Sequence, residues 1–440
     1  ESLLPSAQTF WQKALLVKRL NVPIRLNRKC NDNQYYIQPG DGKRQYCAEH
    51  CLSVTKCGEV TVPEDHLFRC YYCTSNQVDS CHADSAVDGP GIDNTDFVLY
   101  VSAVNSNRCR GRDTIAYAAH CQQESQLDRP IAGHVNLCPE AVSANAQDQE
   151  ILSSTVKHEL LHALGFSAGL FAFYRDERGA PLTPRNEFGK PKFLNKAKGY
   201  YEWSDRVVKV VRRSDWLTRH GPIQHDVHMI VTPGVQKAVQ EHFNCTTLEG
   251  AELENQGQDG TAITHWEKRL FENEAMTGTH TQNPVYSRVT LALMEDTGWY
   301  RANYSVAQDL HWGYHLGCEF ATKSCGYWIQ SRRNMSKSIA PYCSSIKAST
   351  QYHQARTTCT ENRDAVALCN LDRYEKPIPK EYQYFQSLPH VDDLYLGHYG
   401  GTVELADYCP YSQYFQSLPH VDDLYLGHYG GTVELADYCP

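Results

Sequence analysis

The sequence lacks both a surplus of basic residues and a long apolar run. Its 42 Lys and Arg residues are outnumbered by 51 Asp and Glu residues, so the net charge is −9 and the pI is near 6.1. A nucleic-acid binder would need a basic stripe, and this composition argues against that class. No apolar stretch approaches the roughly 20 residues that span a bilayer, so membrane association would depend on segments absent from the chain. The first residue is Glu1 and not Met, and we expect any signal peptide or pro-segment to have been removed or left out.

Cysteine, by contrast, is abundant. Eighteen cysteines are spread over 440 residues, and such scattered spacing favours disulfides and an oxidising compartment. Three sequons, at Asn244, Asn303 and Asn334, are candidate glycosylation sites and agree with passage through the secretory pathway. We therefore expect a secreted or cell-surface protein. A rival interpretation is a small zinc knuckle that would be built from Cys47, Cys51, Cys57, Cys70 and Cys73.

Hydrophobic patterning predicts two strands followed by a long helix in the N-terminal part. Residues 96–104 are a dense run of β-branched and aromatic residues, and 131–139 reads as a shorter strand. Residues 146–165 then have apolar positions at helical spacing, and Gly165 is a good helix terminator.

The rest of the chain is less regular. We predict helices at 201–216 and at 287–300, and past about residue 306 the chain becomes cysteine-rich without clear periodicity. Residues 383–410 recur unchanged at 413–440. Structural repeats diverge and occur in larger numbers, so this pair suggests a recent duplication or an assembly artefact, and we assign it no function.

The predicted helix at 146–165 contains the sequence HELLH. Two residues four apart on a helix differ by about 40° in direction and about 6 Å in rise, so His158 and His162 can face one ion. Glu159 points beside the metal and can take a proton from water as a general base. Zinc lowers the pKa of a coordinated water from ~15.7 to about 7. The flanking Leu, Ala and Val residues, and Gly165 at the HExxHxxG spacing, argue against a merely solvated helix face.

A catalytic zinc takes three protein ligands, and Ala168 stands where a third one might be expected. One protease class uses a glutamate from a later helix, but the candidate Glu202 does not have the spacing of that class. Metzincins instead use a third histidine and a methionine in a tight turn. His265, followed by Met276 in the sequence MTG, fits this pattern best. It is favoured over a competing cluster of His220, His225, His228 and Met229.

At these motifs the chain resembles the leishmanolysin family of metzincin proteases, and most closely its animal branch, the invadolysin or leishmanolysin-like peptidases. The likeness rests on "HELLHALGFSAGLF" (158–171), "ELENQG" (252–257), "HWEKRLFENEAMTG" (265–278) and "LALMEDTGWY" (291–300). It runs from about Cys57 to Cys409. The terminal duplication departs from the family pattern.

The resemblance implies an α+β fold of the metzincin type. A twisted sheet and the active-site helix would form an N-terminal catalytic subdomain at 1–165. A central subdomain at 166–305 would hold a large insertion, His265 and Met276, and a disulfide-rich domain with the duplicated segment would occupy 306–440. The family pattern gives His158, His162 and His265 as ligands of one Zn²⁺ per chain, with Gly165 ending the helix.

The resemblance also implies an endopeptidase derived from a zymogen, with Glu159 as its catalytic residue. It would be a monomer that hydrolyses internal bonds of protein or peptide substrates. The strand at 132–137 would be the sheet edge that pairs with substrate, and His134 would be an exposed strand residue. The alternative is a weak or inactive protease-fold adhesion protein, which the presence of Glu159 disfavours. Some animal relatives occur in the cytoplasm or at lipid droplets, which gives an alternative location.

Overall fold

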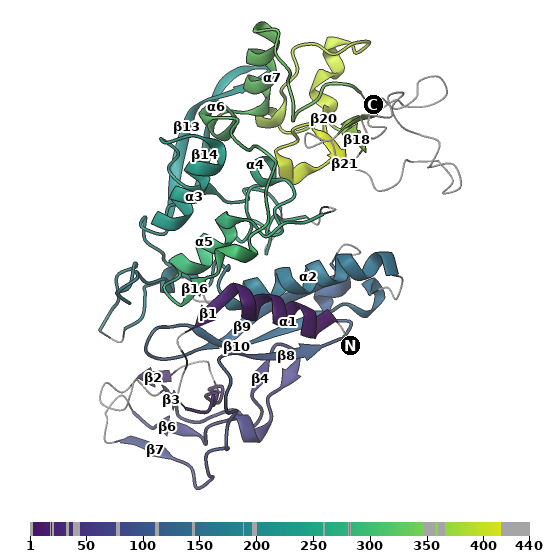
Figure 1. Cartoon of the computed structure of the whole chain (residues 1–440). Coiled ribbons are helices and arrows are strands. Elements are labelled where there is room, and N and C mark those ends of the chain that lie inside the picture. The colour runs from purple at the N-terminus through teal and green to yellow at the C-terminus, as the bar shows by residue number, and fades with distance from the viewer. Residues whose placement is uncertain are drawn as a thin grey trace. The chain divides into compact units, whose positions relative to one another are not determined.

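The computed structural model describes residues 3–414, apart from 18, 20–21, 32–34, 38–44, 76–79, 111–113, 143–145, 188, 196–199, 258–259, 280, 282, 347–356 and 360–365. The chain divides into two compact units (Figure 1). The first comprises Glu1–Val207 with Leu291–Val306, and the second comprises Val208–Thr290 with Ala307–Pro440.

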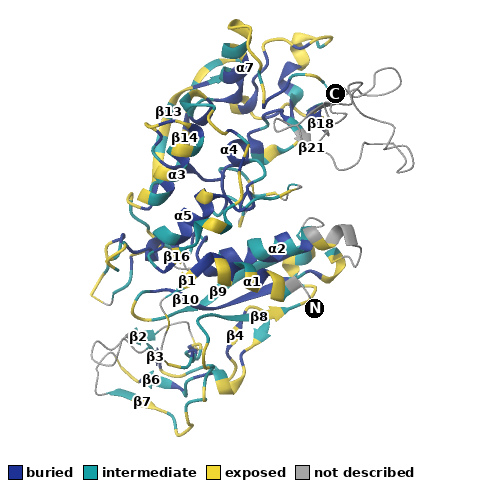
Figure 2. Ribbon diagram, in the orientation of Figure 1, coloured by how far each residue is buried: buried dark blue, intermediate teal, exposed yellow. Residues whose placement is uncertain are grey.

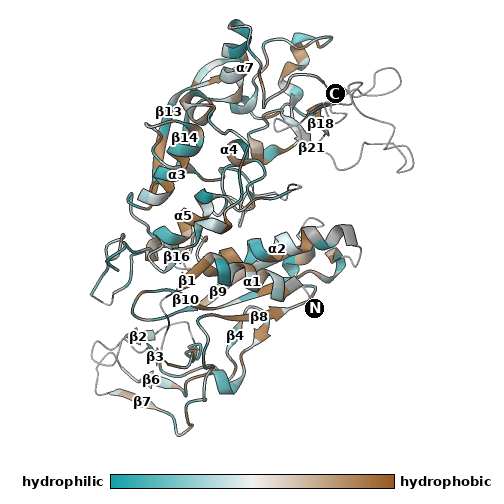
Figure 3. Ribbon diagram, viewed as in Figure 1, coloured by the Kyte–Doolittle hydropathy of each residue, from teal (hydrophilic) through white to brown (hydrophobic). Residues whose placement is uncertain are grey.

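A three-stranded sheet is the centre of the first unit. Its order is β8 (Val98–Ser102), β10 (Pro130–Leu137) and β9 (Ala116–Gln123), with β10 parallel to β8 and antiparallel to β9. The predicted strands at 96–104 and 131–139 are therefore confirmed. Figure 2 shows β10 as buried along most of its length, and Figure 3 shows the apolar character of β8 and β10. The buried central strand thus belongs to the sheet on which the helix described next packs.

Helix α2 (Ala146–Leu164) packs on this sheet, with α1 (Leu3–Ala14) beside it (Figure 1). The apolar positions of α2 are buried, among them Leu152, Val156 and Leu161, because period-3.6 spacing places them on one face. A Cβ on Gly133 would lie 3.0 Å from Cβ of Ala163. The glycine in β10 thus lets the helix approach the sheet closely, and the predicted helix at 146–165 is confirmed.

Short elements and disulfides complete the first unit. Five disulfides, Cys30–Cys47, Cys51–Cys70, Cys57–Cys121, Cys73–Cys81 and Cys109–Cys138, hold it together. The zinc-knuckle interpretation is wrong, because all five of its cysteines are disulfide-bonded. The remaining elements are β1 (Leu15–Val17), β2 (Tyr35–Ile37), β3 (Gln45–Ala48), β4 (Lys56–Cys57), β5 (Val60–Thr61), β6 (Tyr71–Cys73), β7 (Cys81–Ala83), β11 (Phe193–Asn195), β12 (Tyr200–Tyr201), β16 (Tyr300–Ala302) and most of α5 (Arg288–Asp296).

The helix predicted at 201–216 is wrong. Residues Val208–Thr218 form strand β13, which pairs with β14 (Gly221–Ile230) in an antiparallel hairpin joined by two residues. Valine is β-branched and favours an extended backbone. The hairpin partner lies only a few residues downstream, and its ladder bonds outweigh the local helical spacing. The helix predicted at 287–300 is confirmed in position as α5, and Gly298 follows it with φ +76°.

The second unit is built on the sheet β13–β14–β15, where β15 is Ala251–Glu252. Its helices are α3 (Pro233–Phe243), α4 (Lys268–Phe271), α6 (Cys318–Thr322) and α7 (Cys325–Asn334). Short strands β17 (Thr357–Cys359), β18 (Val366–Cys369), β19 (Leu371–Arg373), β20 (Tyr399–Gly401) and β21 (Ser412–Tyr414) follow. Disulfides Cys245–Cys318, Cys325–Cys409 and Cys343–Cys369 connect these pieces.

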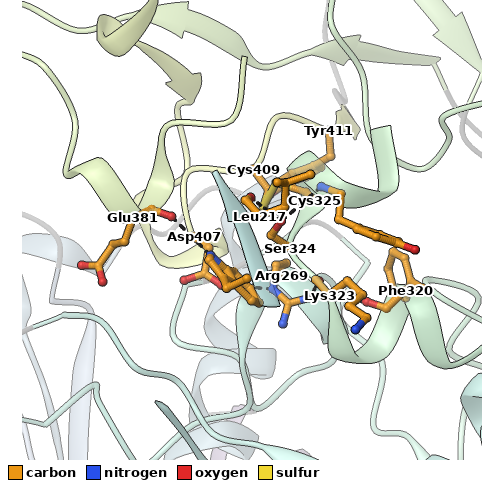
Figure 4. Close-up of a disulfide and its surroundings, with 12 residues drawn as sticks. Leu217, Arg269, Phe320, Lys323, Ser324, Cys325, Glu381, Asp407, Cys409 and Tyr411 are labelled. Atoms are coloured by element: carbon orange, nitrogen blue, oxygen red, sulfur yellow. Dashed lines mark hydrogen bonds and ion pairs between the residues drawn. A yellow bond between two sulfur atoms is a disulfide. The ribbon is translucent and has the colours of Figure 1, made fainter. Parts of the chain in front are cut away.

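A buried guanidinium lies at the centre of this second unit. Arg269 is 1% exposed, its Nε donates to Asp407 at 3.0 Å, and its terminal nitrogen lies 3.3 Å from Glu252. Figure 4 shows Arg269 and Asp407 near the Cys325–Cys409 disulfide. Because an isolated buried charge is very costly, this ion-pair network ties the C-terminal segment to α4.

Two further predictions from the sequence concern membrane-spanning helices and the duplicated C-terminal segment. Among the described residues, none of the helices has the length and apolar composition needed to cross a bilayer. The first copy of the duplicated segment, 383–410, is described, whereas the second copy lies outside the described residues except for its first two positions.

Candidate metal centre

Helix α2 brings two imidazoles together. The Nε2 atoms of His158 and His162 are 3.0 Å apart, and the two rings are nearly perpendicular. Two imidazole nitrogens bound to one zinc ion at about 2.0–2.1 Å would have a comparable separation. The i, i+4 spacing therefore produces the paired donor geometry that the sequence predicted.

The ring of His162 has its other nitrogen fixed. Nδ1 lies 2.7 Å from the carbonyl oxygen of Phe166, to which it donates its proton. Burial lowers the pKa of His162, so the ring is neutral near pH 7. A neutral imidazole that donates from Nδ1 presents a lone pair at Nε2, which is the arrangement of metal-binding histidines.

Glu159 lies beside this pair and is 9% exposed. Burial raises the pKa of its carboxyl to about 8, and a hydrogen bond from the backbone N–H of Ala118 in β9 partly opposes that shift. A nearby cation would favour the ionised form and bring the pKa down. The carboxyl is therefore suited to exchanging a proton near neutrality.

His265 belongs to the second unit, and its Nδ1, like that of His162, lies against a backbone carbonyl oxygen. Its Nδ1 lies 2.9 Å from the carbonyl oxygen of Thr261, and the side chain is 7% exposed. The neighbouring Trp266 donates its backbone N–H to the carbonyl of Met276 at 2.9 Å. His265 thus presents Nε2 as an acceptor, next to the segment that contains the methionine.

Met276 is fully buried in a tight turn that runs from Glu274 to Thr277. Sequence reasoning missed the residue that organises this turn, Glu274. Its buried carboxylate accepts hydrogen bonds from the backbone N–H of Met276 at 2.6 Å and from both the N–H and hydroxyl of Ser287, and it contacts Thr290. The only available signal was its position two residues before the methionine.

The rival third ligands have other partners. Glu202 pairs with Lys192 at 3.0 Å, His220 Nε2 lies 3.0 Å from the amide oxygen of Gln383, and His225 stacks on Trp216. His225 also forms a candidate cation-binding group with two buried acids, but Arg269 already neutralises both of those carboxylates.

The strand expected at the sheet edge is not at the edge. Residues 132–137 belong to β10, which lies between β8 and β9. His134 is 8% exposed and not an exposed strand residue, so this expectation is also wrong. Among the described residues β9 pairs only with β10, and it is β9 that bonds to Glu159.

The three sequons differ in their surroundings. Asn244 and Asn334 are exposed, whereas Asn303 is partly buried and its Nδ2 donates to the carbonyl of Lys13 at 3.1 Å. The first two side-chain amides are therefore more accessible to modification than the third.

Comparison with known proteins identifies relatives that align with most of this chain. The model of the family described as leishmanolysin matches residues 51–419. A leishmanolysin-like peptidase of Caenorhabditis elegans is 54% identical over 412 residues, which cover 94% of this chain and 62% of the relative. One of Drosophila melanogaster is 54% identical over 415 residues, covering 94% and 59%.

A more distant relative is leishmanolysin of Leishmania donovani, with 29% identity over 320 residues, 73% of this chain and 43% of the relative. The chain thus spans about three-fifths of the length of the worm and fly proteins. The family resemblance noted in the sequence is confirmed, and the chain belongs to the leishmanolysin family of peptidases.

Proposed function

We propose that the protein is a zinc-dependent metalloendopeptidase that hydrolyses internal peptide bonds. The observation that carries this proposal is the pair of imidazoles on α2, His158 and His162, with the carboxyl of Glu159 beside them. The family, whose members carry the name peptidase, implies a metal ion. We infer that His265 is the third ligand of the ion that His158 and His162 would bind, as the pattern of the family implies.

The donor set suits zinc. Zinc prefers imidazole nitrogen, and a catalytic site combines three protein ligands with one open position. His162 and His265 both donate from Nδ1 to a backbone carbonyl, so Nε2 is the metal-facing atom in each. When bound, zinc would supply a Lewis acid and lower the pKa of water at the site.

Among the side chains of this protein, Glu159 would carry out the proton transfers of the reaction. Its carboxylate would take a proton from the attacking water and then give that proton to the leaving amine, so the reaction is balanced without another acid. Ala118 N–H orients the carboxyl for both steps. Met276 would form the apolar floor below His265 without binding the metal.

The substrate would bind along β9. An extended peptide can add to an exposed sheet edge through main-chain hydrogen bonds, and β9 takes this role in place of the strand at 132–137.

Metal analysis tests the ligands. We expect one zinc per chain in the wild type and clear loss of zinc in His162→Ala and His265→Ala. His228→Ala is the matched control, because it removes a half-buried histidine of the second unit that the proposal does not use. Retention of zinc by His265→Ala, together with loss by His228→Ala, would refute the assignment.

A fluorogenic peptide assay tests the base. Glu159→Gln should keep its zinc and lower kcat by about 10²–10⁴-fold, the usual contribution of a general base. Glu202→Gln removes the rival carboxylate and should change kcat little. If Glu159→Gln cleaves like the wild type, Glu159 is not the base. If neither protein cleaves peptides, the adhesion alternative gains support.

The disulfide bonds are the basis for the proposed cellular location. Eight disulfides are formed by the described residues, which favours a secreted or cell-surface protein over a cytoplasmic one. Within this proposal Asn244 and Asn334 carry glycans. Treatment of secreted material with a glycosidase would lower its apparent mass, and an Asn244→Gln, Asn334→Gln variant should show no such change.

A further inference from the structure

Strand β9 is tethered to a small hairpin on the face of the sheet away from α2. The hydroxyl of Tyr117 in β9 donates to the Glu59 carboxylate at 2.5 Å. Glu59 lies in the turn between β4 and β5. Four residues along β9, Cys121 is disulfide-bonded to Cys57, which ends β4. Two bonds, one covalent and one hydrogen bond, therefore join the same turn to the same strand.

The turn is held closely against the sheet. Gly58 has φ +60°, and a Cβ at this position would lie 2.2 Å from the ring of His134 in β10. His134 Nε2 in turn lies 3.8 Å from the Glu59 carboxylate. Only glycine can lie so close to the His134 ring. This close approach of the turn to the sheet brings the Glu59 carboxylate to the Tyr117 hydroxyl.

The tethered strand is the one that contacts the catalytic carboxyl. Tyr117 immediately precedes Ala118, whose backbone N–H donates to Glu159. The other neighbour of β9 is β10, paired with it from Ala116 to Gln123. Along its open side, β9 has no described strand to limit its movement, so the tethers at Tyr117 and Cys121 supply that restraint.

We propose that Glu59 is a positioning residue for peptide hydrolysis, which acts through the Tyr117 hydroxyl to hold Ala118 N–H against Glu159. The proposal rests on the proposed function, since it assigns Glu59 a role in the same reaction. Glu59 touches neither substrate nor metal. Loss of the tether leaves the disulfide and the β10 pairing intact, so the strand remains in place but moves more freely near Ala118.

Kinetics of Tyr117→Phe, Glu59→Ala and the double variant test this. Each single variant should lower kcat, expressed per zinc-loaded chain, about tenfold. KM should change less than twofold, because the sheet edge available to substrate is unchanged. The double variant should lose no more kcat than Tyr117→Phe, because that substitution already breaks the bond to Glu59 as well as the 2.7 Å contact of the same hydroxyl with Ser106. Glu59→Gln retains an acceptor for the Tyr117 hydroxyl and should recover most of kcat. Tyr304→Phe removes another tyrosine–carboxylate hydrogen bond of the first unit, to Glu295 at 2.8 Å and outside β9, and should leave kcat unchanged.

Amide hydrogen exchange gives a readout that does not depend on turnover. Exchange at Ala118 should rise in Tyr117→Phe and Glu59→Ala but not in Tyr304→Phe. Unchanged kcat and exchange in an active, zinc-loaded Tyr117→Phe protein would overturn the proposal, as would additive losses in the double variant. Failure of the proposed function looks different, because the wild type itself would then lack zinc or activity.

Discussion

A Cβ atom on Gly165 would lie 2.9 Å from Cε of Met294. Gly165 directly follows helix α2, and Met294 is buried in α5. This glycine does not have a positive φ, so the reason for it is close packing and not a left-handed helix terminus. Its backbone N–H and that of Phe166 both bond to the Leu161 carbonyl, and Phe166 in turn holds His162.

Substitution of Gly165 should therefore destabilise the fold. Gly165→Ala overpacks the contact with Met294, and we expect a loss of about 1–3 kcal/mol in the free energy of unfolding. Gly169→Ala is the control, because its nearest atoms are 3.7 Å away. Urea denaturation of both variants measures the difference, and equal stabilities would contradict this explanation of Gly165.

Arg269 is expected to be among the costliest side chains to remove. Arg269→Ala leaves Glu252 and Asp407 buried without their cation, so we expect about 3–5 kcal/mol of destabilisation. Arg212→Ala breaks the exposed pair with Asp226 and should cost less than about 1 kcal/mol. Similar denaturation midpoints for the two variants would show that the buried network contributes little.

Removal of the metal should lower thermal stability. A ligand that binds only the native state at 1,000 times its Kd adds about 4 kcal/mol. A chelator should therefore reduce the melting temperature of the wild type, and added zinc should restore it. His162→Ala should show no such response, whereas His220→Ala should behave like the wild type. A response that persists in His162→Ala would indicate a metal site elsewhere.

Stability should also fall in mild acid because of His242. Burial lowers the pKa of His242 to about 4, although its bond to the Trp312 carbonyl opposes the shift. The unfolded state, with a pKa near 6.5, then binds more protons between about pH 6.5 and 4. His242 does not change the stability above pH 6.5, and as the pH falls through that interval its protonation in the unfolded state lowers the free energy of unfolding by about 3 kcal/mol. His242→Gln should flatten this part of the stability curve, as measured by denaturation at several pH values.

Local sequence patterns were enough to predict that His158 and His162 lie together on one helix. The i, i+4 spacing of His158 and His162 follows from helix geometry alone, and α2 ends at Leu164, immediately before the glycine that predicted its end. The strands at 96–104 and 131–139 were visible because β-branched and aromatic residues gather there. The disulfide-bonded character of the chain also followed from its cysteine content.

The pairing of strands and the contacts between distant segments could not be predicted from local sequence patterns. The segment at 208–211 lies within the helix predicted at 201–216 and is a strand because β14 pairs with it. Likewise, strand order decides that β9 and not β10 has the open edge, and no residue in 132–137 encodes its neighbours. The bond from Ala118 to Glu159 and the tether of Tyr117 to Glu59 join residues far apart in the chain. Such contacts depend on packing between elements, which amino-acid spacing along one segment does not contain.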